Sequence, residues 1–198
     1  MSDHDRHVAD VSASDDSAKP VPRAGIDTVE HLVAHLAEVI QPSSAIVCVG
    51  NELRGDDAAG LAVARRLGGA VPWDVYNTQS VPESFLMKIV RRRPESVLLV
   101  DALDFNARPG AVELFEIERL CGQGPSTHGP APLAFLDVLH MMHPCRRAVL
   151  GIQPAGSGFG QPMSEPVVEA VERVAQAFFR LPGAQNIAGA ARGAPPAR

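Results

Sequence analysis

The sequence contains few cysteines and no long apolar run. Its three cysteines, Cys48, Cys121 and Cys145, are an odd number without paired spacing, so no disulfide framework is expected. No stretch approaches the roughly 18 apolar residues of a membrane-spanning helix. The first ten residues, MSDHDRHVAD, carry acids and histidines where a secretory signal peptide has positive charge and an apolar segment. These absences predict a soluble protein of the reducing cytoplasm.

The sequence also lacks an excess of positive charge. It has 18 Lys and Arg residues against 23 Asp and Glu residues, which gives a net charge of -5. Proteins that bind nucleic acid gather Lys and Arg on one face. The basic run at residues 91–93 ends an amphipathic segment, where the helix dipole favours cations. We therefore expect a solvated helix end at that run and no nucleic-acid partner.

Several motifs of well-known active sites are missing. Neither GxGxxG nor GxxxxGK[ST] occurs, so dinucleotide and P-loop sites lack their phosphate cradle. There is no GxSxG elbow, and three serines lack a recognisable triad setting: Ser84, Ser126 and Ser164. His140 and His143 have no HExxH, zinc-finger or EF-hand context, and we interpret them as helix-end residues. His4 and His7 belong to the N-terminal end of the chain, where we expect at most weak adventitious metal binding.

The composition along the chain predicts one domain with a tail at each end. A chain of 198 residues with 45% apolar residues is long enough for one well-buried core and short for two. Residues 1–23 are rich in Asp, Ser, His and Pro, and residues 183–198 in Gly, Ala, Pro and Arg. Such segments have little to bury and are expected to be disordered. We therefore predict a folded domain over residues 24–182.

Apolar periodicity within that domain predicts alternating helices and strands. The predicted helices cover residues 26–40, 58–67, 83–92, 132–142 and 165–181. The predicted strands cover residues 45–49, 73–78, 97–100, 112–117 and 148–152. Residues 112–117 alternate apolar and acidic side chains, which is typical of a strand near an edge. This order predicts an α/β three-layer sandwich: a mostly parallel twisted sheet of about five strands, covered by helices on both faces, with room for an antiparallel strand.

Two acidic motifs follow buried strands, where ligands of open α/β sheets gather. The first ends in Asp56 and Asp57, and the second begins with Asp101 at the end of four aliphatic residues. Asp56 is interpreted as a helix-capping residue, which leaves Asp57 to face the strand edge. Asp104 is interpreted as a turn residue. Asp101 emerges from a dry strand and needs a partner there, although plain strand termination has equal weight.

A third candidate ligand is His128, which lies in the Gly- and Pro-rich loop before the helix predicted to begin at Pro132. Taken alone, a histidine in a loop is usually exposed to solvent and is not a metal ligand. Two carboxylates and an imidazole together suit a first-row divalent ion and leave room for water. The sequence therefore predicts that Asp57, Asp101 and His128 hold a divalent metal at the open edge of the sheet.

Residues 46–60, IVCVGNELRGDDAAG, resemble the opening motif of the nickel–iron hydrogenase maturation endopeptidases. Further segments follow in the family's order: 81–83, 99–104 with Pro109-Gly110, 126–128, 150–154, 158–159 and 162–164. The last of these are most similar to the branch that serves formate-hydrogenlyase-type hydrogenases, the hydrogenase 3 maturation proteases. The resemblance covers roughly residues 45 to 180. It departs at Ala58, where the family often has Gly, and we expect a slightly more regular helix start there.

The resemblance implies an endopeptidase that removes a C-terminal extension from a nickel–iron hydrogenase large-subunit precursor after nickel insertion. The family's metal-contacting and catalytic positions fall on Asp57, Asp101 and His128. The nickel would be supplied by the precursor, which is the expected partner. The attacking nucleophile stays open between an aspartic-type and a nickel-dependent mechanism. We expect a cytoplasmic monomer without a membrane partner, and the rival hypothesis is a non-catalytic chaperone that checks the precursor for nickel.

Overall fold

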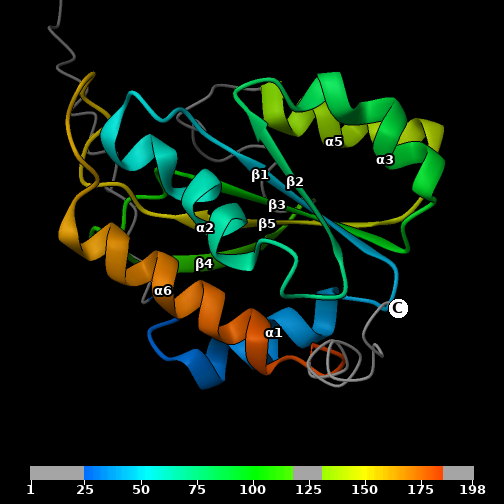
Figure 1. The fold of residues 1–198 in the computed structure, drawn as a ribbon, viewed down its shortest axis with the longest axis horizontal. Helices are drawn as coiled ribbons and strands as arrows, with labels where there is room; N and C mark the ends of the chain where they lie inside the picture. Colours follow the sequence, from blue (N-terminus) through cyan, green and yellow to red (C-terminus); the bar gives the residue numbers. More distant parts are fainter. Residues whose placement is uncertain (1–24, 118–130, 185–198) are drawn as a thin grey trace, which may run out of the picture.

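A five-stranded sheet with the strand order β2-β1-β3-β5-β4 forms the centre of this computed structural model (Figure 1). The structure describes residues 25–117 and 131–184, so His128, Cys121, His4, His7 and nearly all of both predicted tails lie outside the described residues. The strands are β1 (Ser44–Val49), β2 (Asp74–Gln79), β3 (Ser96–Ala102), β4 (Val112–Glu116) and β5 (Arg146–Ile152). All neighbours pair in parallel except β4, which is antiparallel to β5.

Helices cover both faces of the sheet, as the sequence predicts. On one face lie α1 (Val29–Val39), α2 (Ala59–Leu67) and α6 (Glu165–Arg180), and on the other lie α3 (Leu86–Arg92) and α5 (Ala131–Met142) (Figure 1). Two short 3-10 helices, η1 (Gly55–Ala58) and η2 (Pro82–Phe85), precede α2 and α3. The predicted α/β sandwich with a mostly parallel sheet is therefore confirmed. None of the helices in the described ranges is long and apolar enough to cross a membrane.

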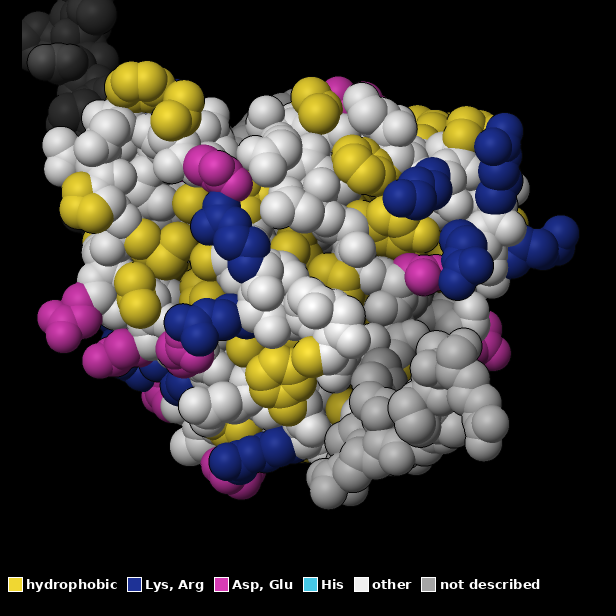
Figure 2. All heavy atoms as spheres, viewed as in Figure 1, with side chains coloured by type: hydrophobic (Ala, Val, Ile, Leu, Met, Phe, Trp, Pro, Cys, Tyr) yellow, Lys and Arg dark blue, Asp and Glu magenta, His cyan; other side chains and the backbone are white. Residues whose placement is uncertain are grey.

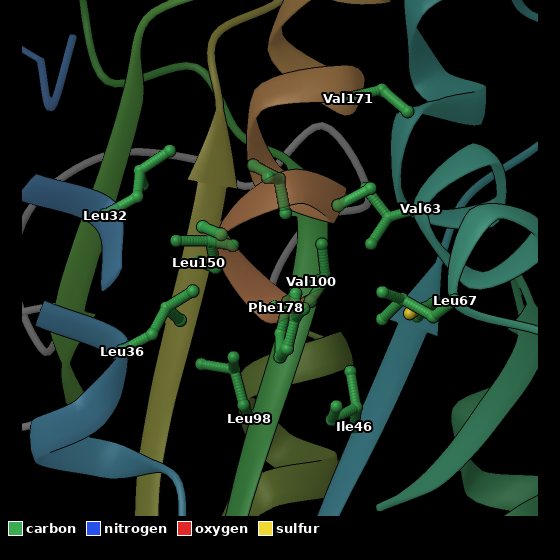
Figure 3. Close-up of a cluster of buried hydrophobic side chains, with 14 of the residues drawn as sticks. Leu32, Leu36, Ile46, Val63, Leu67, Leu98, Val100, Leu150, Val171 and Phe178 are labelled. Atoms are coloured by element: carbon green, nitrogen blue, oxygen red, sulfur yellow. The ribbon is translucent and has the colours of Figure 1, made fainter. Parts of the chain in front are cut away.

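The central strands are buried on both faces, which explains their continuous apolar runs. In β1, Ile46 and Cys48 belong to the core beneath α1, α2 and α6, whereas Val47 and Val49 belong to the core beneath α3 and α5. Figure 3 shows the first of these cores, where side chains from the helices meet those from the strands. Its labelled members are Leu32, Leu36, Ile46, Val63, Leu67, Leu98, Val100, Leu150, Val171 and Phe178.

The first helix is shorter than predicted. It begins at Val29 because Thr28 caps it: the Thr28 side chain accepts a hydrogen bond from the His31 N–H at 3.2 Å. Ile26 instead lies in a non-helical segment and donates its N–H to the Val112 carbonyl at 2.7 Å. The apolar side chain of Ile26 packs against the same core as the helix. The prediction from hydrophobic spacing therefore began three residues before the true start of the helix.

The order of the strands creates a topological switch point between β1 and β3. From β1 the chain crosses to β2 on one side, and from β2 it crosses back to β3 on the other side of β1. The loops that follow β1 and β3 consequently leave the sheet in opposite directions. In open parallel sheets, ligands bind in the crevice that such a divergence creates at the carboxyl ends of the strands.

Candidate functional site

Asp57 and Asp101 lie at this switch point, one in the turn that follows β1 and the other near the end of β3. Asp101 is the sixth residue of β3 and pairs with Gly151 of β5, while Asp57 lies in η1, the turn that follows β1. The turn η1 contacts β3. Both residues are buried, with only 3% of Asp57 and 1% of Asp101 exposed. Two carboxylates therefore occupy a largely dry position at the carboxyl end of the sheet.

Two glycines allow the turn with Asp57 to pack directly on the strand ends. A Cβ at Gly60 would lie 2.2 Å from the Val49 carbonyl oxygen and 2.5 Å from that of Val100. A Cβ at Gly50 would lie 2.4 Å from the Asp57 carbonyl oxygen. Each distance is shorter than any real Cβ contact with backbone, so a side chain at either position would push the turn off the sheet. Both glycines thus fix the depth at which Asp57 sits.

Asp56 has a different role from the predicted one. We expected it to cap its own helix, but neither η1 nor α2 has a side-chain cap. Its carboxylate instead accepts hydrogen bonds from the N–H groups of Ala155 (2.8 Å), Gly156 (3.1 Å) and Ser164 (2.6 Å), and from the Ser164 hydroxyl (2.9 Å). The capping prediction is therefore wrong. The buried charge is satisfied by donors of the β5–α6 loop, which it fastens to the turn that carries Asp57.

Gln153, which sequence reasoning did not single out as a site residue, organises the loop after β3. Its Oε1 accepts hydrogen bonds from the N–H groups of Phe105 (2.9 Å) and Ala107 (3.1 Å). Its Nε2 donates to Asp104 Oδ1 at 3.1 Å, and the same oxygen accepts the Asn106 N–H at 3.1 Å. The prediction of Asp104 as a turn residue is confirmed. The signal for Gln153 was a polar side chain directly after a buried apolar strand.

The third predicted ligand, His128, lies outside the described residues. Within residues 25–117 and 131–184, no group of three or more His, Cys, Asp or Glu side chains is arranged to hold a metal ion. Of the three residues predicted as ligands, the described part of the chain thus contains only Asp57 and Asp101. Oxygen donors of this kind suit a hard or borderline divalent ion, and the imidazole of His128 would extend the set as the sequence predicts.

The structure agrees with the interpretation of His140 and His143 as helix-end residues and of the basic run as a solvated helix end. Near the end of α5, the His140 ring nitrogen Nδ1 lies 3.1 Å from the Cys145 carbonyl, and His143 Nε2 lies 2.9 Å from the Pro94 carbonyl. Both rings are held by backbone at the amino-terminal edge of the sheet, opposite to Asp57. Arg92 is exposed at the end of α3 and forms an ion pair with Asp74 at 2.7 Å. We assign no site to these groups.

A buried thiol lies in β1, the strand that leads to the turn with Asp57. Cys48 is fully buried in β1, and burial raises the pKa of its thiol far above the ordinary value, with the negative charge of Asp101 adding to the shift. The thiol therefore stays protonated and neutral at physiological pH. A neutral, enclosed thiol is not a nucleophile, so Cys48 has a packing role.

Cys48→Ala is accordingly expected to leave the activity of the site within about twofold of the wild type, with a loss of about 1 kcal/mol of stability from the small cavity. Alkylation followed by mass spectrometry would check the same point, because native protein should leave Cys48 unmodified. A folded Cys48→Ala variant without activity would contradict the assignment.

Comparison with known proteins agrees with this geometry. A family model described as hydrogenase maturation protease (HycI) matches residues 63–180. The hydrogenase 3 maturation protease of Escherichia coli K12 is 33% identical over 150 residues, which cover 74% of this chain and 94% of the relative. The crystal structure of a [NiFe] hydrogenase maturation protease HycI from Thermococcus kodakarensis is similar with a TM-score of 0.66 and 30% identity, over 72% of this chain and 94% of that one. The endopeptidase HybD from E. coli, at 17% identity and a TM-score of 0.59, shares the fold.

Proposed function

Because the chain belongs to the hydrogenase maturation protease family, we propose that it is an endopeptidase that removes the C-terminal extension of a nickel–iron hydrogenase large-subunit precursor after nickel insertion. The observation that carries the proposal is the buried pair Asp57 and Asp101 at the switch point of the sheet. The name of the E. coli relative supports a substrate of the hydrogenase 3 type. The protein would act as a cytoplasmic monomer whose domain spans residues 24–182.

In this proposal, Asp57, Asp101 and His128 together bind the nickel that the precursor carries. Nickel in the precursor would supply a Lewis acid next to the scissile peptide bond. The carboxylates of this chain orient the nickel-bearing precursor, and the protein around them keeps bulk water away, because both residues are buried at the strand ends. A precursor without nickel would bring no cation to two buried negative charges, so its docking is disfavoured.

The same carboxylates offer a base for the hydrolytic step. Hydrolysis of a peptide bond requires that an attacking water lose a proton while the leaving amine gains one. A carboxylate within hydrogen-bond distance of that water can hold the proton between the two events. We assign this role to the Asp57 and Asp101 pair, since the Cys48 thiol is protonated and enclosed, and the Ser164 hydroxyl is bonded to the structural Asp56 carboxylate.

Mass spectrometry of the large subunit in cells with and without this protein tests the proposal. The large subunit is expected to keep its C-terminal extension in cells without the protein and to lose it when the protein is restored. A mature subunit in both strains would contradict an endopeptidase. A gel-shift assay with purified nickel-loaded precursor separates the endopeptidase from the rival hypothesis. A non-catalytic chaperone would bind the precursor without shortening it.

A further inference from the structure

Two large apolar side chains stand exposed on the loops beside the candidate site. Leu53, in the loop between β1 and η1, is 60% exposed, and Phe159, in the loop between β5 and α6, is 75% exposed. Figure 2 shows hydrophobic side chains gathered at its upper left, where Figure 1 places the β5–α6 loop. Exposed apolar groups at the rim of a polar site are typical of a surface that a partner covers.

Hydrogen bonds connect the two loops that carry these side chains. The Leu53 carbonyl accepts the Gly160 N–H at 2.7 Å, so the residue next to Phe159 is bonded to the backbone of Leu53. The Leu53 N–H donates to Asn51 Oδ1 at 3.0 Å. The Asp56 carboxylate fastens the start of the β5–α6 loop to the same turn, as described above. The apolar pair, Leu53 and Phe159, thus stands on two loops that are tied to one turn, so a partner that binds there loses less entropy than it would in ordering free loops.

One member of the apolar pair, Leu53, lies in the loop that leads into the turn with Asp57. Leu53 precedes Asp57 by four residues, and the Asn51 N–H donates to the Asp57 carbonyl at 3.0 Å. The neighbouring Glu52 forms an ion pair with Arg65, which places charged groups beside the apolar pair. An apolar centre with a polar rim is the usual composition of a protein–protein interface. A polypeptide whose scissile bond reaches Asp57 has residues on either side of that bond within reach of this surface.

We propose that Leu53 and Phe159 form a docking surface for apolar side chains of the precursor's C-terminal segment, next to the bond that is cleaved. The inference rests on the proposed function, because it takes the precursor as the polypeptide that reaches Asp57. The surface contributes binding of residues away from the reacting bond, so it acts on the affinity for the precursor and leaves the chemical step unchanged.

Two other exposed apolar residues supply matched controls. Met141, at the end of α5, is 76% exposed, and Phe179, at the end of α6, is 40% exposed. The 16-residue helix α6 starts beside Asp56 and runs away from it, so Phe179 lies about 20 Å from the site at 1.5 Å per residue. Substitution of these residues removes the same kind of side chain from the opposite end of the molecule.

The test compares a Leu53→Ser, Phe159→Ser double variant with a Met141→Ser, Phe179→Ser double variant on purified nickel-loaded precursor. We expect the KM of the first to rise about 10-fold to 100-fold with kcat within about twofold, and both constants of the second to stay at the wild-type values. An unchanged KM in the first variant would overturn the docking surface, and so would a fall in kcat at constant KM. A third outcome is that the wild type self-associates, the first variant does not, and the KM is unchanged. This outcome would assign the surface to a second copy of this chain and likewise overturn the proposal.

A binding isotherm for the same precursor separates this inference from the proposed function. If the wild type binds the precursor without cleaving it, and the Leu53→Ser, Phe159→Ser variant binds about 10-fold more weakly, the docking surface stands and the endopeptidase function fails. Equal binding by wild type and variant overturns the docking surface whether or not cleavage occurs. A wild type that neither binds nor cleaves the precursor overturns both. Thermal unfolding of both double variants provides the folding control, because the substituted side chains are exposed.

Discussion

Asp57→Asn and Asp101→Asn are each expected to reduce processing of the nickel-loaded precursor by about 100-fold or more. Asparagine has nearly the volume of aspartate, so the substitution spares the packing around these buried side chains. It removes the negative charge that attracts a cation and the basic oxygen that accepts a proton. Initial rates of precursor shortening by purified variants measure the effect.

Asp74→Asn is the matched control for these two variants. Asp74 begins β2, at the end of the sheet opposite Asp57, and its ion pair with Arg92 is partly exposed to solvent. The control should process the precursor at the wild-type rate, because exposed ion pairs contribute little. Thermal unfolding of all three variants identifies any loss of fold. Wild-type processing rates for both Asp57→Asn and Asp101→Asn would refute the assignment of the site.

Asp56→Ala is expected to lower the free energy of unfolding by about 3 to 5 kcal/mol. The Asp56 carboxylate is 1% exposed and accepts hydrogen bonds from three N–H groups and one hydroxyl of the segment from Ala155 to Ser164. Hydrogen bonds to a charged group contribute more than neutral ones, and the donors left behind would lie in a partly buried place without an acceptor. Urea denaturation followed by circular dichroism measures the loss.

Two further variants show which part of this network matters. Ser164→Ala removes only the hydroxyl donor and keeps the Ser164 N–H, so we expect a loss of about 1 to 2 kcal/mol. Asp56→Asn keeps one carbonyl oxygen as an acceptor, so its loss of unfolding free energy should lie between those of Ser164→Ala and Asp56→Ala. An Asp56→Ala variant that unfolds at the same urea concentration as the wild type would show that the carboxylate does not hold the β5–α6 loop.

The sequence predicted the elements whose signals are local. Residues 45–49 and 97–100 are continuous apolar runs, and the structure has β1 and β3 there because both strands are covered by helices on both faces. The alternation over residues 112–117 correctly indicated an edge strand, since β4 ends the sheet. The start of α1 was missed because Ile26 contributes to the core from a non-helical segment, which periodicity does not distinguish from a helical turn.

The candidate site was predictable only in part, because the partners of its residues are distant in sequence. Asp57 and Asp101 follow continuous apolar runs in the sequence, and the rule for open sheets places both at one edge. The donors to Asp56, however, lie 99 to 108 residues away, so the sequence offered only its local capping preference. Gln153 likewise holds residues 46 to 49 positions earlier in the chain. A local pattern does not show which distant backbone group a polar side chain meets.

In the proposed function, Asp57 and Asp101 process a precursor that carries nickel. Its most direct test is intact-mass spectrometry of purified large-subunit precursor, with and without nickel, after incubation with the wild type or with the Asp57→Asn, Asp101→Asn double variant. We expect loss of a C-terminal peptide only from nickel-loaded precursor and only with the wild type. A nickel-loaded precursor that stays intact with the wild type, or that the double variant shortens at the wild-type rate, would contradict it.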